Sequence, residues 1–154
     1  MIFILCAVLA LAHSAERLVD PIVTETRIGE LQLEYESFAK TGDWEGAQKA
    51  IRQAAALDPD HPKPYLLVVL LSSRRAAREQ AGGIMDSLGP TAGPGRIYGE
   101  GLALFMNDKH AAAAAEFNRA LELYRVMDHA AGQAACHTAL GNVERQAGRL
   151  DEAM

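Results

Sequence analysis

The stretch "GDWEGAQKAIRQAAALDPDHP", residues 42–62, indicates how this chain folds. Its alanines recur at the spacing of one helix face, and small side chains there let the backbone of a neighbouring helix approach closely. The stretch ends at "LDPDHP", where Asp58 and Pro59 stop a helix. We therefore expect a helix that begins at Trp44 and packs through small residues. The alanines of this face are Ala47, Ala50 and Ala54.

The residues before this stretch carry a second apolar stripe. Leu31, Tyr35 and Phe38 fall at the spacing i, i+4 and i+7, which places their side chains on one helix face. That helix would end at "KTGD", where Gly42 can adopt a left-handed cap and Asp43 can cap the next helix. The two helices are therefore expected to form a hairpin.

The hairpin pattern returns further along the chain. The small residue Ala47 has counterparts at Ala81, Ala113 and Ala153, at successive separations of 34, 32 and 40 residues. A period of about 34 residues is typical of stacked helical hairpins, in which no hairpin can bury its apolar face alone.

Three segments resemble tetratricopeptide repeats: "TGDWEGAQKAIRQAAALDP", "NDKHAAAAAEFNRALEL" and "ALGNVERQAGRLDEAM". That pattern places an aromatic residue and Leu-Gly on the first helix of a repeat, alanines around a large apolar residue on the second, and a closing proline. The resemblance, to bacterial arrays in particular, implies an all-α, right-handed superhelix (α-solenoid) of antiparallel helical hairpins. The repeat positions that it implies are Trp44, Ala47, Ala54, Pro59, Ala81, Gly101, Ala113, Phe117, Ala120, Gly141 and Ala153.

Two features depart from the pattern. Tyr35 stands where the first repeat should carry glycine, and Gly82 and Gly83 interrupt the second helix of the second repeat. That helix should be short or bent, because glycine inside a helix costs about 1 kcal/mol relative to alanine. The expected division is a polar lead-in at residues 15–27 and repeats at 28–61, 62–93, 94–133 and 134–154, the last one incomplete.

In this family the first helix of each repeat lines a concave groove that receives a peptide or a partner's helix. The resemblance implies such a groove here, with an apolar and aromatic centre and polar ends, as in protein-binding surfaces. The alternative is that neighbouring helices bury its apolar positions, because "YLLVVLL", residues 65–71, is apolar all round. The implied groove residues are Gln32, Glu36, Lys40, Leu66, Leu70, Arg74, Tyr98, Leu102, Phe105, Asn142 and Arg145.

Other kinds of site find little support in the sequence. The net charge of −5 argues against nucleic acid, which requires a basic surface. The glycine-rich segment at residues 89–101 lacks the spacing of a nucleotide-binding loop and is interpreted as a turn between repeats. We expect no metal, because His110, His129 and His137 have no second ligand at helical spacing. No nucleophile motif is present, so we expect no catalytic residue, cofactor or small-molecule substrate.

The first residues, 1–14, are typical of a secretory signal peptide. They contain a short apolar run and the small residues "ALA" at positions 10–12, but no lysine or arginine precedes the run. We expect export to the periplasm or the cell envelope, with two alternatives left open: a cytoplasmic protein whose start is mis-assigned, or the tail of a longer membrane anchor. Cys136 would be the cysteine left after cleavage, and we expect it to be a small core residue.

These observations favour a non-catalytic scaffold that binds a protein or peptide in the concave groove. The alternative is a sensory or regulatory repeat region of a longer signalling protein, with a catalytic domain downstream of residue 154, because the fourth repeat lacks its second helix. A third hypothesis is self-association through that incomplete C-terminal repeat, since the open apolar end of an array invites stacking.

Overall fold

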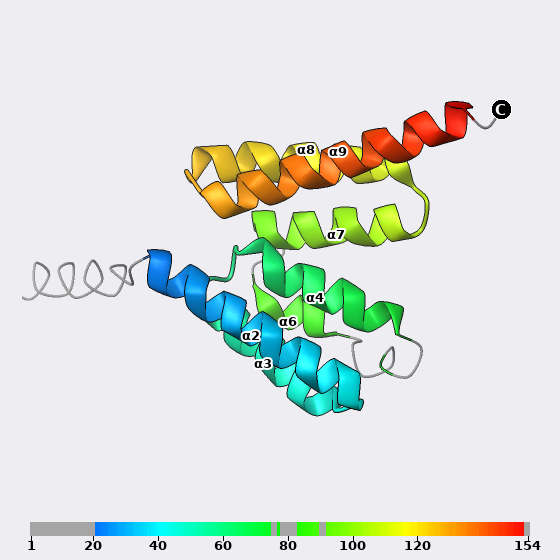
Figure 1. Cartoon of the computed structure of the whole chain (residues 1–154). Helices are drawn as coiled ribbons and strands as arrows, with labels where there is room; N and C mark the ends of the chain where they lie inside the picture. The colour runs from blue at the N-terminus through cyan, green and yellow to red at the C-terminus, as the bar shows by residue number, and fades with distance from the viewer. Residues whose placement is uncertain (1–20, 75–76, 78–82, 90–91, 153–154) are drawn as a thin grey trace, which may run out of the picture.

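The computed structural model describes residues 21–74, 77, 83–89 and 92–152, with backbone alone for residues 149–152. Every regular element in these ranges is a helix, which confirms the all-α class (Figure 1). The helices are α2 (Pro21–Thr41), α3 (Trp44–Leu57), α4 (Pro62–Ser73), α6 (Ile84–Leu88), α7 (Pro94–Met106), α8 (His110–Val126) and α9 (Ala130–Glu152).

Helix α2 begins earlier than the sequence pattern indicated. Its first residue is Pro21, so residues 21–27, expected to be a polar lead-in, are helical. The helix that the sequence pattern indicated from Ile28 therefore includes at least seven earlier residues, 21–27.

The turn between α2 and α3 follows the prediction. Gly42 takes a φ of 77°, in the left-handed region that glycine adopts without strain. The carboxylate of Asp43 accepts a 2.9 Å hydrogen bond from the backbone N–H of Gly46 and so caps α3. Helix α3 then runs from Trp44 to Leu57, and the alanines of its predicted face are buried against α2 and α4.

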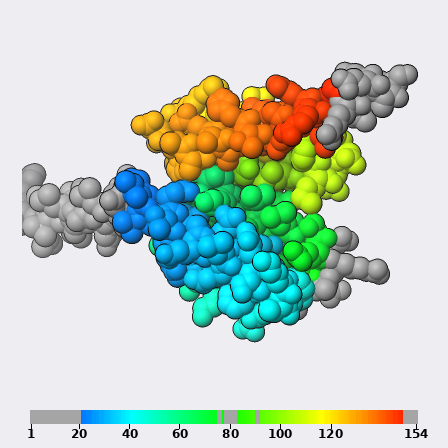
Figure 2. All heavy atoms as spheres, in the orientation of Figure 1, coloured from blue at the N-terminus to red at the C-terminus, as the bar shows by residue number. Residues whose placement is uncertain are grey.

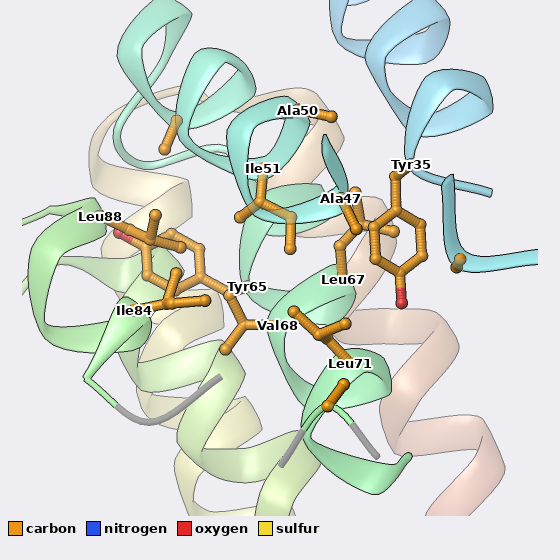
Figure 3. Close-up of a cluster of buried hydrophobic side chains, with 13 residues drawn as sticks. Tyr35, Ala47, Ala50, Ile51, Tyr65, Leu67, Val68, Leu71, Ile84 and Leu88 are labelled. Carbon is orange, nitrogen blue, oxygen red and sulfur yellow. The ribbon is translucent and has the colours of Figure 1, made fainter. Parts of the chain in front are cut away.

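Helix α4 provides the centre of the first hydrophobic cluster. Helices α2, α3, α4 and α6 contribute buried side chains to this cluster (Figure 3). The α4 members that hold the other three helices together are Tyr65, Leu67, Val68 and Leu71. Full burial of one large aliphatic side chain such as Ile51 contributes roughly 1.5–3 kcal/mol. The labelled members of the cluster are Tyr35, Ala47, Ala50, Ile51, Tyr65, Leu67, Val68, Leu71, Ile84 and Leu88.

The segment predicted to hold the second helix of the second repeat is described in part, and it contains the short helix α6. Helix α6 spans only Ile84–Leu88 and follows Gly83, whose φ of 78° is left-handed. The guanidinium of Arg96 on α7 forms a 2.8 Å ion pair with Asp86 on α6. Ala81, the expected repeat marker, lies outside the described residues, as does Gly82.

Helices α7, α8 and α9 form the second hydrophobic cluster. On α7, a Cβ added to Gly101 would lie 2.7 Å from the ring of Phe117 on α8, so these helices meet at a distance that only glycine permits. Gly141 is the residue predicted for the corresponding position on α9, and a Cβ added there would meet no atom within 4 Å. Cys136 is completely buried in this cluster, in agreement with the prediction of a core residue.

The turns α7–α8 and α8–α9 share one geometry. In each, the residue before the second helix, Lys109 or His129, donates its backbone N–H to the carbonyl five positions earlier. The preceding residues, Asp108 and Asp128, take left-handed φ values of 58° and 52°, which aspartate tolerates better than most residues. Lys109 and His129 are therefore equivalent positions with different side chains.

Candidate functional site

Helices α2, α4, α7 and α9 follow one another across the molecule, each in contact with the next (Figure 1). They carry the residues predicted to line a groove, with Arg74 directly after the end of α4. We call the surface formed by these predicted residues the first-helix face.

The apolar centre of the first-helix face is only partly covered. Leu66, Leu102 and Phe105 pack against the second hydrophobic cluster and remain partly exposed. Leu70 keeps 40% of its surface exposed. Tyr98 differs, because it is only 6% exposed and its ring centroid lies 5.6 Å from that of Phe117. Neighbouring helices therefore cover Tyr98, as the alternative interpretation anticipated for the apolar positions.

Polar side chains stand on both sides of this centre. On α2, the amide of Gln32 donates a 3.1 Å hydrogen bond to Glu36, and Lys40 is exposed. On α9, the guanidinium of Arg145 donates to the side-chain oxygen of Asn142. The first-helix face therefore has polar flanks of mixed charge.

The predicted repeat positions lie mostly in the core. Trp44 is partly buried against the first cluster, whereas Pro59 and Gly141 are exposed and Ala153 lies outside the described residues. The buried positions are Ala47, Ala54, Gly101, Ala113, Phe117 and Ala120.

A second feature, which the sequence analysis missed, lies where the start of α2 meets the α8–α9 turn. Figure 2 shows the blue start of α2 and the orange start of α9 next to each other at one end of the molecule. Between them is a hollow of about 1000 Å³, which we call the end hollow. Its lining residues are Pro21, Ile22, Thr24, Glu25, Thr26, Leu57, Asp58, His61, Met127, Asp128, His129, Ala130 and Ala131.

His61 links α2 to α4 at the wall of the end hollow. Its Nδ1 accepts a 3.2 Å hydrogen bond from the backbone N–H of Lys63 and so caps α4. Because Nδ1 is an acceptor, the neutral ring carries its proton on Nε2, which lies 2.7 Å from the Glu25 carboxylate on α2. The ammonium group of Lys63 lies 3.1 Å from the other oxygen of Glu25.

His129 repeats the same arrangement at the start of α9. Its Nδ1 accepts a 3.0 Å hydrogen bond from the backbone N–H of Gly132, and its Nε2 lies 2.8 Å from the carboxylate of Asp58. The other oxygen of Asp58 accepts from the backbone N–H of Asp60 at 3.0 Å. The rings of His61 and His129 meet edge to face with centroids 5.8 Å apart. Two histidine–carboxylate pairs thus join three parts of the chain.

The environments of the two rings shift their pKa values in opposite directions. The side chain of His61 is 3% exposed, and this burial lowers its pKa although Glu25 opposes the change. The hydrogen bond to Asp58 raises the pKa of His129, which is less buried. Burial would raise the pKa of both carboxyls, but their hydrogen-bond partners outweigh it. His61 and Lys63 lower the pKa of Glu25, and His129 and the backbone N–H of Asp60 lower the pKa of Asp58.

This arrangement leaves little room for acid–base or metal chemistry. In both histidines each ring nitrogen already has a hydrogen-bond partner, so a metal ion or a substrate proton would have to displace one. The described residues contain no group of three or more His, Cys, Asp or Glu that could hold a metal ion. The pairs therefore fix the walls of the end hollow in place.

A weak signal for these pairs is present in the sequence. Each histidine directly precedes a helix, at "DPDHP" and at "VMDHA", which is the position of a capping residue. Their carboxylate partners lie 36 and 71 residues away, so no local pattern could identify them. Partners at the spacing of one helix turn therefore do not include these carboxylates.

Comparisons of the chain with protein-family models, with curated proteins and with solved structures give no match. Among the described residues, no helix combines the length and the hydropathy needed to cross a membrane. The function must therefore be inferred from the chemistry of the first-helix face and of the end hollow.

Proposed function

We propose that the helices form a right-handed superhelix of tetratricopeptide type, and that the chain is a non-catalytic scaffold that binds a protein or peptide on the first-helix face. Short connections support the hairpin arrangement, because residues 42–43 join α2 to α3 and residues 107–109 join α7 to α8. The close approach of Gly101 to Phe117 supports the family's packing in the α7–α8 hairpin.

The observation that carries this proposal is the partly exposed apolar centre on two adjacent helices. Leu70 on α4 and Phe105 on α7 remain accessible while their helices pack together. A partner that covers such surface gains about 25 cal/mol for each Å² of apolar area removed from water. The polar side chains of α2 and α9 then provide a rim that orients the partner.

Peptide selection followed by NMR mapping tests the proposal. Peptides would be selected from a random dodecapeptide library on the immobilised chain, and the strongest binder titrated into isotope-labelled protein. We expect chemical-shift changes centred on α4 and α7. Perturbations confined to other helices, or a selection that yields no binder, would contradict the proposal.

Two variants sharpen this test. Leu70→Glu combined with Phe105→Glu places two charges in the apolar centre, and we expect affinity to fall by about tenfold or more, which corresponds to about 1.4 kcal/mol. Val126→Glu is the matched control, because Val126 is 86% exposed at the end of α8, away from the first-helix face. Equal losses in both would argue against a site on α4 and α7.

A further inference from the structure

We infer that the end hollow is a second binding site, which accepts a peptide segment of a partner protein that carries lysine or arginine beside a large aliphatic residue. The end hollow is distinct from the first-helix face, since it is formed by the first turn of α2, the α3–α4 connection and the α8–α9 turn. The inference therefore does not depend on binding at the first-helix face.

The apolar part of the end hollow comes from three separate segments. Ile22 on α2, Leu57 at the end of α3 and Met127 in the α8–α9 turn are 74%, 43% and 49% exposed. Single exposed apolar side chains are common on protein surfaces, but several grouped in one concavity mark a binding site. Methionine adds adaptability, because its unbranched side chain fits different apolar partners.

The charged part of the end hollow is acidic. Among the residues that the structure describes, its lining contains the carboxylates of Glu25, Asp58 and Asp128 and no lysine or arginine. Lys63 offsets one of these three charges, and a protonated His129 would offset a second, so the lining remains negative at neutral pH. A cationic side chain is therefore the complementary group.

The carboxylates are held in place and retain acceptor capacity. Each oxygen of Glu25 and of Asp58 accepts one hydrogen bond from the protein, and a carboxylate oxygen can accept two. The histidine pairs fix these groups before a ligand arrives, so binding requires little further ordering of the protein. Asp128 stands exposed at the rim and can meet an approaching cation first.

The size and charge of the end hollow favour a peptide over other ligands. At about 1000 Å³ it is at the upper end of the range for a drug-sized molecule. A small organic cation would leave Ile22 or Met127 in water, whereas a peptide of several residues can cover both and place a basic side chain at the carboxylates. Nucleic acid is repelled by the acidic lining, and a second copy of this chain carries a net charge of −5.

The test is a peptide selection with subtraction. A random dodecapeptide library would be selected on the full chain and then depleted on the variant Ile22→Ser/Met127→Ser, which removes two exposed apolar contacts. We expect the peptides that survive depletion to be enriched in lysine or arginine adjacent to leucine, isoleucine or methionine. Survivors without basic residues, or depletion that leaves no survivors, would overturn the inference.

Affinities of one surviving peptide for single-site variants identify the residues of the chain that the peptide contacts. By fluorescence anisotropy we expect Asp128→Asn to weaken binding by about two- to fivefold, as for a single exposed charge. Asp108→Asn is the matched control, since Asp108 has the same left-handed conformation in the α7–α8 turn, outside the end hollow. Equal effects of both substitutions would contradict a site at the α8–α9 turn.

Two further variants separate this site from the first-helix face and test folding. Leu70→Glu/Phe105→Glu should leave the affinity of the surviving peptide unchanged, and a loss there would place the peptide on the first-helix face and overturn the inference. Leu33→Ser removes an equally exposed apolar side chain of α2, 66% exposed, that does not line the end hollow. It should bind like the unchanged chain, and a loss equal to that of Ile22→Ser/Met127→Ser would refute the assignment.

Discussion

The hydroxyl group of Tyr124 donates a 2.6 Å hydrogen bond to the backbone carbonyl of Asp60, which lies 64 residues earlier in the chain. Tyr124 is completely buried, and burial raises the pKa of its hydroxyl, so the group remains a donor across the physiological pH range. This bond joins the last turn of α8 to the connection that precedes α4 and lies beside the two histidine–carboxylate pairs.

Replacing this hydroxyl should destabilise the fold. We expect Tyr124→Phe to lower the free energy of unfolding by about 1–2 kcal/mol, because the partly buried carbonyl of Asp60 loses its partner. Urea denaturation followed by circular dichroism measures the change. Tyr98→Phe is the control, because no described residue hydrogen-bonds to the Tyr98 hydroxyl, and its effect should stay within about 0.5 kcal/mol. Equal losses would show that the Asp60 contact has no special role.

Alanine at Gly101 and at Gly141 should have opposite effects. At Gly101 the added Cβ would lie 2.7 Å from the Phe117 ring, and we expect a loss of about 1–3 kcal/mol from overpacking. At Gly141 the space is open, so Gly141→Ala should increase stability by about 0.5–1 kcal/mol through helix propensity. Unfolding free energies measured for both proteins check this. The same sign of change at both sites would contradict the described packing of α7 on α8.

The two histidines should affect stability in opposite pH windows. Because burial lowers the pKa of His61, its contribution is present above the ordinary histidine pKa of about 6.5 and is lost as the pH falls from there through the lower folded-state pKa. Because the bond to Asp58 raises the pKa of His129, its contribution is present below about pH 6.5 and is lost as the pH rises through the folded-state value.

Asparagine substitutions measure these contributions, because asparagine can still cap a helix but cannot reach the distant carboxylate. The loss of stability in His61→Asn should grow from about pH 5 to pH 8, whereas the loss in His129→Asn should shrink over the same range. Urea denaturation at each pH gives both profiles. If the stability losses of the two variants changed with pH in the same direction, the pKa values of His61 and His129 would not be shifted in opposite directions.

The thiol of Cys136 should be unreactive in the folded chain. Burial raises its pKa to about 11, so very little thiolate is present at neutral pH and reagents cannot reach the sulfur. In a Cys6→Ser background we expect no reaction with a disulfide reagent until denaturant is added, followed by one equivalent of thiol. Rapid reaction of the folded protein would indicate that α9 opens away from α8.

The sequence predicted those helices whose ends are set by residues next to them in the chain. Helix α3 is one example, because the residues that set its ends are next to it in the sequence. The structure confirms the left-handed conformation of Gly42, the cap at Asp43 and the end of the helix at Asp58. The helical residues 21–27 were missed because none of them is buried, so no apolar stripe extends through them.

The sites were harder to predict because they depend on contacts between distant segments. Tyr98 occupies a groove position by register, yet its ring packs against Phe117, which only the angle between α7 and α8 decides. The end hollow depends on the pairs of His61 with Glu25 and of His129 with Asp58, which lie far apart in the chain. Neither the packing of Tyr98 nor the pairing of the histidines produces a periodic pattern in the sequence.

The long-range hydrogen bonds around the end hollow affect how the chain folds. In an array whose hairpins touch only their neighbours, each unit can unfold nearly independently, and stability is a sum of local terms. Here Tyr124 and His129 hold residues 64 and 71 positions away, beyond the adjacent hairpin. The ordering of α8 and α9 is thus coupled to that of the α3–α4 connection, so the molecule should unfold in one cooperative transition rather than hairpin by hairpin.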